Sequence, residues 1–479
     1  MAKKRKKTLL IAGGAALAVV LLIFLVLLFG AKALKPRIVA AASKALGMEV
    51  KVRGGVGISL FPALGASIAD IVVTNGGSDV ATVAKTKVGL KLLPLITGRV
   101  RISRMDIVKP VLFVVRQKDG KLNIGKPGGR SKGTPVSLEK LAVSAGSLLH
   151  TDLRTGGEIA LDGIDITAGN VRSGGTPGET PLKTLSFSGD IRCQAIRAGN
   201  LTITDLIMGV VGKNGVFAAD DVRMNVFGGP GNGTLQADFS GAEPRFTFSF
   251  VEKSLKIEQL LRGSSNAKNM EGLADLSAEL TARGKTIGEV KRSLRGQASL
   301  SGENIVLNGL DIDDVISSLL RSRRFNLVDV GSFFLAGPLG PALTRGYRFA
   351  DLFADSQGGK SVITRLVSVW KIEKGVAEAV DVAMATEKRR IAMKGGLNFA
   401  DSRFEEVVVA VVDQNGCAEV KQKIRGPFSH PEIGNIDIFK SLTKPVINLL
   451  KSAVNLFSNK PCEMFYSGSV APPQEAKRP

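Results

Sequence analysis

Side chains that build catalytic and metal sites are scarce in this sequence. Its 479 residues include two histidines, three cysteines, one tryptophan and two tyrosines. The histidines, His150 and His430, are separated by 280 residues, which excludes a histidine-rich metal site within one chain. Neither a G-x-S-x-G nor an H-E-x-x-H motif occurs. We therefore expect no enzymatic activity, no cofactor and no metal site.

Two short glycine-lysine segments come nearest to a phosphate-binding loop. Gly284-Lys285-Thr286 and Gly359-Lys360-Ser361 match the end of that motif, but Glu279 and Ala354 stand where its leading glycine belongs. Neither segment is predicted to bind a nucleotide. A hydrolase with an unfamiliar site is a minor alternative, and it requires His150 to meet a serine and a carboxylate in the fold.

Aromatic side chains are also too few for a nucleic-acid-binding surface. The chain carries 65 basic and 43 acidic residues, a net charge of +22, but no motif that combines basic with aromatic residues. Phosphate-bearing lipid surfaces are the favoured partner of such an excess of cations, and general solubility is the alternative explanation. No nucleic-acid partner is expected.

One long uncharged run stands at the N-terminus. Residues 1–7 contain five cations, whereas residues 8–30 contain no charge. As a helix, the uncharged run would be about 35 Å long, enough to cross a bilayer core of roughly 30 Å. Because cationic flanks stay cytoplasmic, we predict a cytoplasmic tail over 1–7 and a transmembrane anchor over 8–30, with the rest beyond the membrane. A signal peptide cleaved near Ala31-Lys32-Ala33 is the alternative.

Three cysteines allow one disulfide and one free thiol. In an oxidising compartment Cys417 and Cys462 can pair, which would leave Cys193 as a buried thiol. The sequence alone does not establish this pairing.

Abundant glycine and short runs of β-branched residues favour strands joined by tight turns. The chain has 55 glycines, and its lysines alternate with apolar residues over 85–92. Phenylalanines alternate with polar residues over 246–250 in the same way. The predicted fold is mainly β with some α, in which an elongated antiparallel β-sheet forms a groove or repeat body behind the transmembrane helix.

Helical patterns interrupt these strands near 254–262, 286–295 and 311–322. Residues 436–458 carry apolar side chains at helical spacing and predict an amphipathic helix. Such a helix either packs its apolar stripe on a sheet or lies on a membrane.

Changes in composition divide the chain beyond the anchor. Residues 126–135 are rich in proline and glycine, which is typical of a linker. We predict an N-terminal β domain over 31–125, the linker over 126–135, a middle β-rich region with helices over 136–374, a C-terminal β domain with the amphipathic helix over 375–465, and a disordered tail over 466–479.

Several segments together resemble one family of envelope proteins. Beyond the anchor they are FPALGASIADIVVTN, LKLLPLITGRVRISRMDIVKPVLFVVRQKDGKLNIG, ALDGIDITAG, LRGQASLSGENIVLNGLDIDDVI and CEMFYSGSV, whose cysteine forms a pattern with Cys417. They are similar to AsmA-family proteins of the Gram-negative envelope, over nearly the whole chain. The resemblance implies an inner-membrane anchor, a periplasmic β-rich body and kinship with bridge-type lipid-transfer proteins of the chorein kind. It implies no catalytic residue.

A sheet with one apolar face supplies a mechanism for the function that this resemblance implies. Such a face can shelter acyl chains, at about 0.8 kcal/mol per buried methylene, while Lys and Arg at its edge assist the headgroup. We therefore predict a protein of the inner membrane and periplasm that binds or transfers phospholipid in outer-membrane biogenesis. The groove candidates are Val100, Ile102, Val111, Phe113, Val115, Phe246, Phe248 and Phe250. The headgroup candidates are Lys85, Lys87, Lys91, Arg99 and Arg101.

Each groove candidate has an alternative as an ordinary core residue beneath a covering helix. The main alternative function is an envelope scaffold that influences outer-membrane protein assembly or targeting without carrying lipid. A continuous apolar groove would favour the lipid carrier, and a filled core with a polar surface would favour the scaffold.

Overall fold

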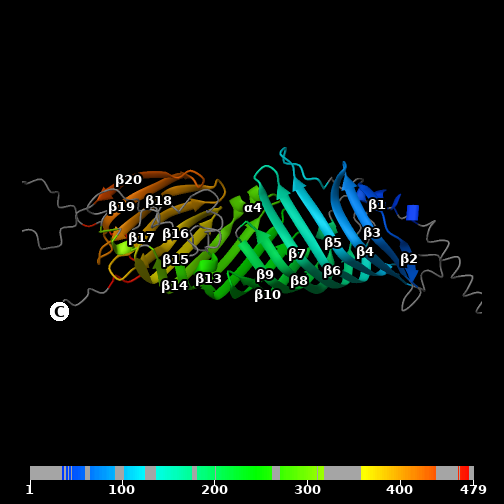
Figure 1. The fold of residues 1–479 in the computed structure, drawn as a ribbon, viewed down its shortest axis with the longest axis horizontal. Coiled ribbons are helices and arrows are strands. Elements are labelled where there is room, and N and C mark those ends of the chain that lie inside the picture. Colours follow the sequence, from blue (N-terminus) through cyan, green and yellow to red (C-terminus); the bar gives the residue numbers. More distant parts are fainter. Residues whose placement is uncertain are drawn as a thin grey trace, which may run out of the picture. The chain divides into compact units, whose positions relative to one another are not determined.

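The computed structural model describes residues 35–36, 39–40, 42–44, 46–59, 65–91, 102–124, 136–174, 181–199, 201–260, 270–309, 311–314, 316–317, 358–438, 462 and 464–473. Across these ranges the chain is mainly β, with twenty strands in one open sheet and short helices between some of them (Figure 1). The predictions of a mainly β fold and an antiparallel sheet are confirmed, with one parallel exception in the first unit.

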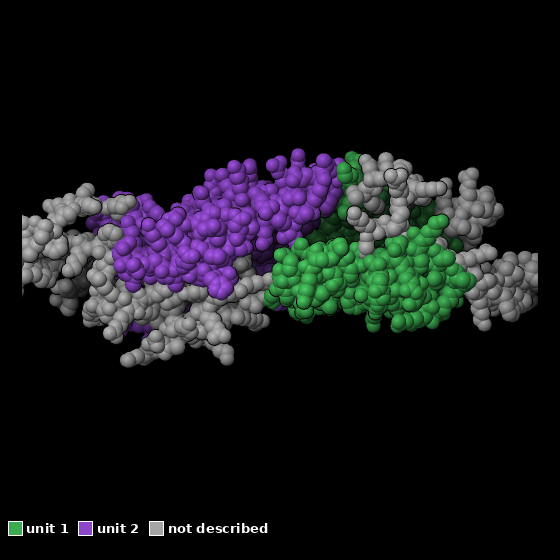
Figure 2. All heavy atoms as spheres, turned by 90° about the horizontal axis from the view of Figure 1, so that it is seen from above, with its two compact units in different colours: residues 1–199, 204–217 green, residues 200–203, 218–479 purple. Residues whose placement is uncertain are grey.

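The chain divides into two compact units. The first comprises residues 1–199 and 204–217, and the second comprises residues 200–203 and 218–479 (Figure 2). The segment boundaries drawn from composition stay predictions. Residues 1–34, which include the predicted anchor, lie outside the described residues. No helix in the described part of the chain is long and apolar enough to span a membrane.

The first unit is built from strands that pair mostly with their sequence neighbours. Its strands are β1 (Glu49–Val52), β2 (Val56–Ser59), β3 (Gly65–Asn75), β4 (Ser78–Leu90), β5 (Ile102–Arg116), β6 (Val136–Asp152), β7 (Gly157–Ser173), β8 (Ser186–Ala198) and most of β9 (Leu201–Lys213), with the 3-10 helix η1 (Pro181–Lys183) before β8. Both β1 and β2 pair with β3, and antiparallel pairing continues from β3 to β5. The pair β5–β6 is parallel, and β6 to β8 are again antiparallel.

A line of bulges crosses the first unit and changes which residues face each side. Lys109 of β5 and Ala145 of β6 have φ angles of 48° and 50°, between register pairs Val108–Ser144 and Val111–Ser147. Since an extra residue interrupts the two-residue alternation of a strand, side chains beyond it change sides. Two rows of paired apolar residues cross the sheet on one face, one row on each side of the bulges. They are Ile107–Val143–Ile166–Ile191 and Leu112–Leu148–Leu161–Ile196.

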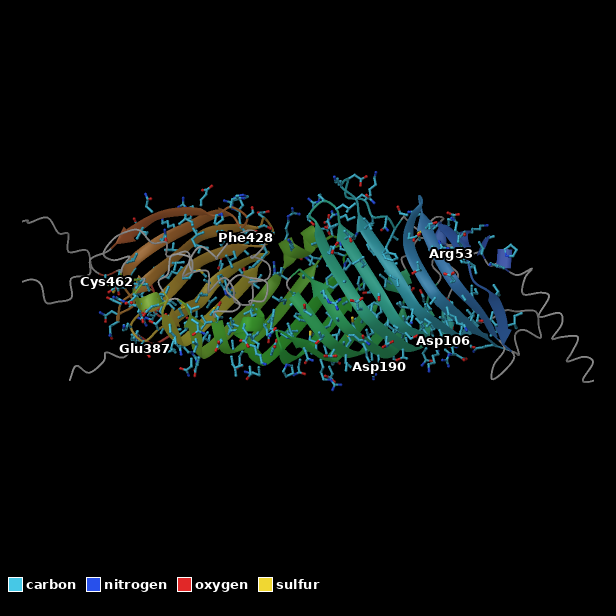
Figure 3. All side chains as sticks on the ribbon, in the orientation of Figure 1. Arg53, Asp106, Asp190, Glu387, Phe428 and Cys462 are labelled. Atoms are coloured by element: carbon cyan, nitrogen blue, oxygen red, sulfur yellow. A yellow bond between two sulfur atoms is a disulfide. The ribbon has the colours of Figure 1, made fainter. Side chains whose placement is uncertain are left out.

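The opposite face of the first unit is polar. One of its rows is Lys87–Asp106–Ala142–Thr167–Asp190. Asp106 and Asp190, both labelled in Figure 3, belong to this row. One face of this sheet is thus apolar and the other charged, which is the arrangement predicted from the alternating lysines.

The second unit continues the antiparallel order. Its elements are β10 (Val216–Val226), β11 (Gly229–Asp238), β12 (Arg245–Lys256), α3 (Ile257–Leu260), β13 (Met270–Arg283), α4 (Ile287–Ser293), β14 (Arg295–Asn308), β15 (Lys360–Glu373), β16 (Val376–Ala385), β17 (Arg390–Asn398), β18 (Arg403–Val412), β19 (Ala418–Pro427) and β20 (Glu432–Ile438). A second line of bulges, at Ser254 of β12 and Asn304 of β14, again shifts the buried residues from even to odd numbers.

Strands β16 to β18 are buried on both faces, so their sequences are nearly continuous apolar runs. One face joins the main core around Trp370 and Leu300. The other is covered by Phe465, Tyr466 and Val470. The tail predicted to begin at 466 therefore starts too early, because these apolar side chains gain stability by packing on the sheet.

The helix predictions were partly correct. Helix α4 lies within 286–295 and begins after Thr286, whose Oγ1 accepts a hydrogen bond from the Glu289 N–H at 3.2 Å. Within 254–262, strand β12 continues to Lys256 with a bulge at Ser254, and only helix α3 (Ile257–Leu260) follows it. The predicted helix over 436–458 is wrong at its start, which is the end of β20, and residues 439–458 lie outside the described residues.

Candidate functional site

An apolar hollow of about 460 Å³ lies within the second unit. Its lining residues are Leu201, Ile203, Met224, Val226, Phe227, Phe248, Phe250, Leu276, Ala278, Leu280, Lys291, Leu294, Ala298, Ile372 and Phe399. Lys291 alone among these fifteen is polar. The volume and composition are those of a site for an apolar small molecule or chain.

The strand register explains why the sheet is hollow here. One row on the inner face reads Leu235–Phe248–Leu280–Gly296–Ile372, and the next reads Gly233–Phe250–Ala278–Ala298–Trp370. Between Phe250 and Trp370 of the second row, Ala278 and Ala298 fill little space. The rings of Phe248 and Phe250 lie nearly parallel, with centroids 6.1 Å apart. Small residues on β13 and β14 therefore leave an apolar depression beside two stacked rings.

Helix α4 brings a cation to this hollow. Ser293 Oγ accepts from the Arg283 N–H at 2.8 Å and donates to the Val290 carbonyl, which fixes the helix to the end of β13. Lys291 is exposed and forms no ion pair within the described part of the chain. A long cationic side chain at such a place can cover apolar surface with its stem while its charged end stays in water.

Glu252 extends the same face of β12 one row beyond Phe250. It pairs with Leu276 of β13, which lines the hollow, and with Gly231 of β11. The side chain is fully buried, and neither carboxyl oxygen has a hydrogen-bond partner within the described ranges. Burial raises the pKa of Glu252 to about 7, and the nearby Gly229 N–H, without full hydrogen-bond geometry, opposes this rise.

A comparison with known protein families supplies the remaining observation. The model of the AsmA family matches residues 1–174 and 179–334 of this sequence. The chain belongs to the AsmA family. No curated individual protein matches it. The AsmA family is not known as a family of enzymes.

Only part of the predicted groove reaches the hollow of this AsmA-family chain. Phe248 and Phe250 line it, whereas Phe246 is half-buried and packs on Phe239, with ring centroids 5.8 Å apart. Ile102 is half-buried in the first unit, opposite Leu90. Val100 lies outside the described residues.

Three further groove candidates lie on the other face of their strand. Val111, Phe113 and Val115 follow the bulge at Lys109, so the apolar row beyond it contains Leu112 and not its odd-numbered neighbours. Phe113 belongs instead to the row Phe113–Leu149–Ala160–Arg197. The bulge at Lys109 therefore separates these three candidates from the apolar row through Leu112.

The predicted headgroup lysines do not border the hollow. Lys87 lies directly opposite Asp106 on the polar face of the first unit, and Lys85 shares that face. Lys91 forms an ion pair with Glu139. Arg99 and Arg101 lie outside the described residues. The cation beside the apolar lining is instead Lys291, which no sequence pattern singled out.

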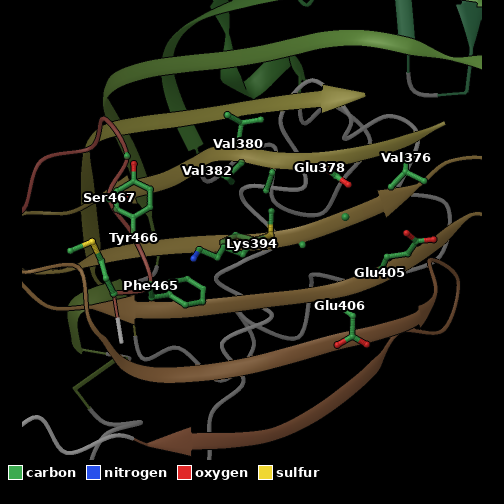
Figure 4. A pocket seen from close by; sticks show the side chains of 16 residues that line it. Val376, Glu378, Val380, Val382, Lys394, Glu405, Glu406, Phe465, Tyr466 and Ser467 are labelled. Carbon is green, nitrogen blue, oxygen red and sulfur yellow. The ribbon is translucent and has the colours of Figure 1, made fainter. Parts of the chain in front are cut away.

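A second hollow, of about 690 Å³, lies between strands β16 to β18 and the segment 464–468. Figure 4 shows Lys394, Phe465 and Tyr466 on one side of it and Glu405 and Glu406 on another. We call it the C-terminal hollow. Unlike the apolar hollow, it is lined by both charged and apolar residues.

Polar groups around the C-terminal hollow bind one another and fix the C-terminal segment. The Tyr466 hydroxyl donates to Asp381, and burial together with this neighbour raises the pKa of Tyr466. The Arg390 guanidinium donates to the Val470 and Asp413 carbonyls at 3.0 and 2.7 Å. Cys417 and Cys462 form a disulfide, with Cα atoms 5.7 Å apart, and Cys193 is a free buried thiol.

No arrangement for acid–base or metal chemistry emerges among the residues that the structure describes. The His150 ring contacts the Val114 carbonyl through Nδ1 at 3.1 Å, and His430 contacts the neighbouring Ser429. No group of three or more His, Cys, Asp or Glu residues within the described ranges could hold a metal ion.

Proposed function

We propose that this AsmA-family chain binds phospholipid by sheltering acyl-chain carbon in the apolar hollow, as a carrier in outer-membrane biogenesis. The observation that carries the proposal is the wholly apolar lining beside a single cation. Phospholipids join hydrocarbon to a phosphate, and the hollow joins Phe248, Phe250 and their neighbours to Lys291. Other apolar ligands would not need the cation.

The acyl chain of the lipid, rather than its headgroup, should supply most of the binding free energy. Each methylene removed from water contributes about 0.8 kcal/mol, so a segment of several methylenes outweighs one exposed ion pair worth at most about 1 kcal/mol. Because Lys291 is exposed, its ammonium group would orient the headgroup rather than hold it.

We further propose that residues 8–30 anchor the chain in the inner membrane and that the two units lie in the periplasm. The disulfide between Cys417 and Cys462 supports this placement, since such bonds persist in oxidising compartments. Alkylation of free thiols in intact cells, before and after reduction, tests it. Labelling of these two cysteines only after reduction is the expected result.

Site-specific crosslinking tests the lipid proposal in the full-length chain in its membrane. A benzophenone amino acid replaces Phe248, which lines the hollow, and after illumination the adducts are identified by mass spectrometry. Thr247 is the matched control, because it is exposed on the opposite face of the same strand. We expect phospholipid adducts at least ten times more abundant from position 248 than from position 247.

Equal adduct yields from the two positions would contradict the proposal. A crosslink from position 248 to a protein instead of a lipid would favour an envelope scaffold. Phe248→Asp, with the crosslinker placed at Leu280, provides the second variant. It should reduce the lipid adduct about tenfold, because a carboxylate in the lining strongly disfavours hydrocarbon.

A further inference from the structure

Glu252 is an anomaly on the apolar face of the second unit. Its row across the sheet reads Gly231–Glu252–Leu276–Leu300–Ser368. Ser368 is three strands away, and its Oγ accepts from the Trp370 indole N–H at 2.8 Å. The carboxyl group thus faces hydrocarbon, next to two lining residues of the hollow, Phe250 and Leu276.

The backbone around Glu252 makes room for this carboxyl group. Gly229 lies so close that a Cβ atom there would be 2.6 Å from Glu252 Oε1. Any larger residue at 229 would displace the acid. A buried polar group without a hydrogen bond costs free energy, so a glycine that accommodates one points to a use for it.

Among the residues that the structure describes, the charged groups on the elements around Glu252 do not neutralise it. On β12 and β13, Lys253 and Asp275 pair with each other at 2.8 Å, and both are exposed or half-exposed. From β11 the facing residues are Gly229 and Gly231, and from β13 the facing residue is Leu276. On α3, Glu258 has one buried oxygen without a partner and would only repel a carboxylate. Ionisation of Glu252 therefore places a negative charge, without a cationic partner among the described residues, next to the apolar lining of the hollow.

We propose that Glu252 makes lipid binding in the hollow proton-dependent. As a neutral acid it leaves the packing next to the lining residues Phe250 and Leu276 intact, and as a carboxylate it draws water toward them and lowers the affinity for hydrocarbon. This inference rests on the proposed function and adds to it a condition for release.

Lipid retention at two pH values tests this inference in the full-length chain, held in a non-ionic amphipol. The probe is radiolabelled phosphatidylcholine, whose headgroup does not titrate between pH 6 and 8. Equilibration against unlabelled phosphatidylcholine vesicles measures relative affinity. With a pKa of about 7 for Glu252, the affinity of the unaltered chain should fall about tenfold from pH 6 to pH 8.

Three variants separate the outcomes. Glu252→Gln keeps the shape but cannot ionise, so it should retain lipid equally at both pH values. Glu252→Met cannot ionise either, so it should also retain lipid equally at both pH values. It should fold, because replacing an unpaired buried acid by an apolar group of similar volume is tolerated. Glu258→Gln is the matched control on α3 and should keep the tenfold change.

The two proposals fail differently in this experiment. An unaltered chain that retains no lipid at either pH would overturn the proposed function. Retention at both pH values without a difference would overturn only the role of Glu252. A tenfold change that persists in Glu252→Gln and Glu252→Met would also overturn that role, and would assign the pH dependence to another group.

Discussion

The two units bury their apolar faces to different extents. In the first, the rows through Ile107 and Leu112 remain half-buried along their whole length. In the second, Trp370 and Ile305 are fully buried, and β16 to β18 are covered on both faces. The second unit thus has a filled core with one apolar hollow left in it. An apolar face alone does not define a binding site; the hollow arises where small residues interrupt a packed row.

The largest expected effect tests the filled core directly. Trp370→Ala should lower the free energy of unfolding of the second unit by about 3–5 kcal/mol, since it leaves a large cavity among residues that cannot collapse into it. Urea unfolding followed by circular dichroism measures this change. A loss below about 1 kcal/mol would contradict a tightly packed core around this indole.

Removing the disulfide should leave one face of β16 to β18 less well covered, so that the second unit, like the first, has an apolar face that is only partly buried. The bond closes 45 residues, so Cys417→Ser combined with Cys462→Ser should cost about 4 kcal/mol in the chain-entropy model. Hydrogen exchange of 464–470 and of β16 to β18 should rise together, because the C-terminal segment covers one face of these strands. Unchanged exchange there would show that Tyr466 and Arg390 hold the segment without the disulfide.

The buried acid makes stability depend on pH. The pKa of Glu252 is raised from 4.5 to about 7 in the folded protein, so its contribution to stability is complete below pH 4.5 and is lost as the pH rises from 4.5 through 7. Glu252→Gln should therefore be more stable than the unaltered chain by about 3 kcal/mol at pH 8, with the difference vanishing near pH 4. Thermal melts at both pH values measure it, and a difference independent of pH would contradict the shifted pKa.

The smallest effect should come from the open face of the first unit. Leu161→Ala removes a half-buried side chain and should cost only about 1 kcal/mol, because much of that surface already meets water. Thermal melts of Leu161→Ala and Trp370→Ala under the same conditions compare the losses of stability in the two units. Equal losses would mean that the first unit is as well packed as the second.

Strand alternation puts Phe248 and Phe250 on one face, and both line the hollow, because no bulge separates them. Glu252 is the next residue in this two-residue alternation, so the sequence already contained the signal for the buried acid. Val111, Phe113 and Val115 lie on the other face from Leu112, since Lys109 adopts a left-handed backbone conformation that its side chain does not predict. Lys291 was missed for a different reason. Its place beside the lining depends on how α4 packs against β13, which is a tertiary contact that local sequence does not encode.

The parallel pair β5–β6 has a consequence for how the first unit assembles. Neighbouring antiparallel strands can pair as a hairpin as soon as a short turn forms. Parallel strands such as β5 and β6 can pair only after the connecting segment has returned along the full length of the strand. Growth of the sheet by successive hairpins therefore halts after β5 and restarts with β6. Closing the loop between β5 and β6 costs conformational entropy before any stabilising contact between the two strands has formed. We therefore expect the pairing of these strands to be the rate-limiting step in the folding of this unit.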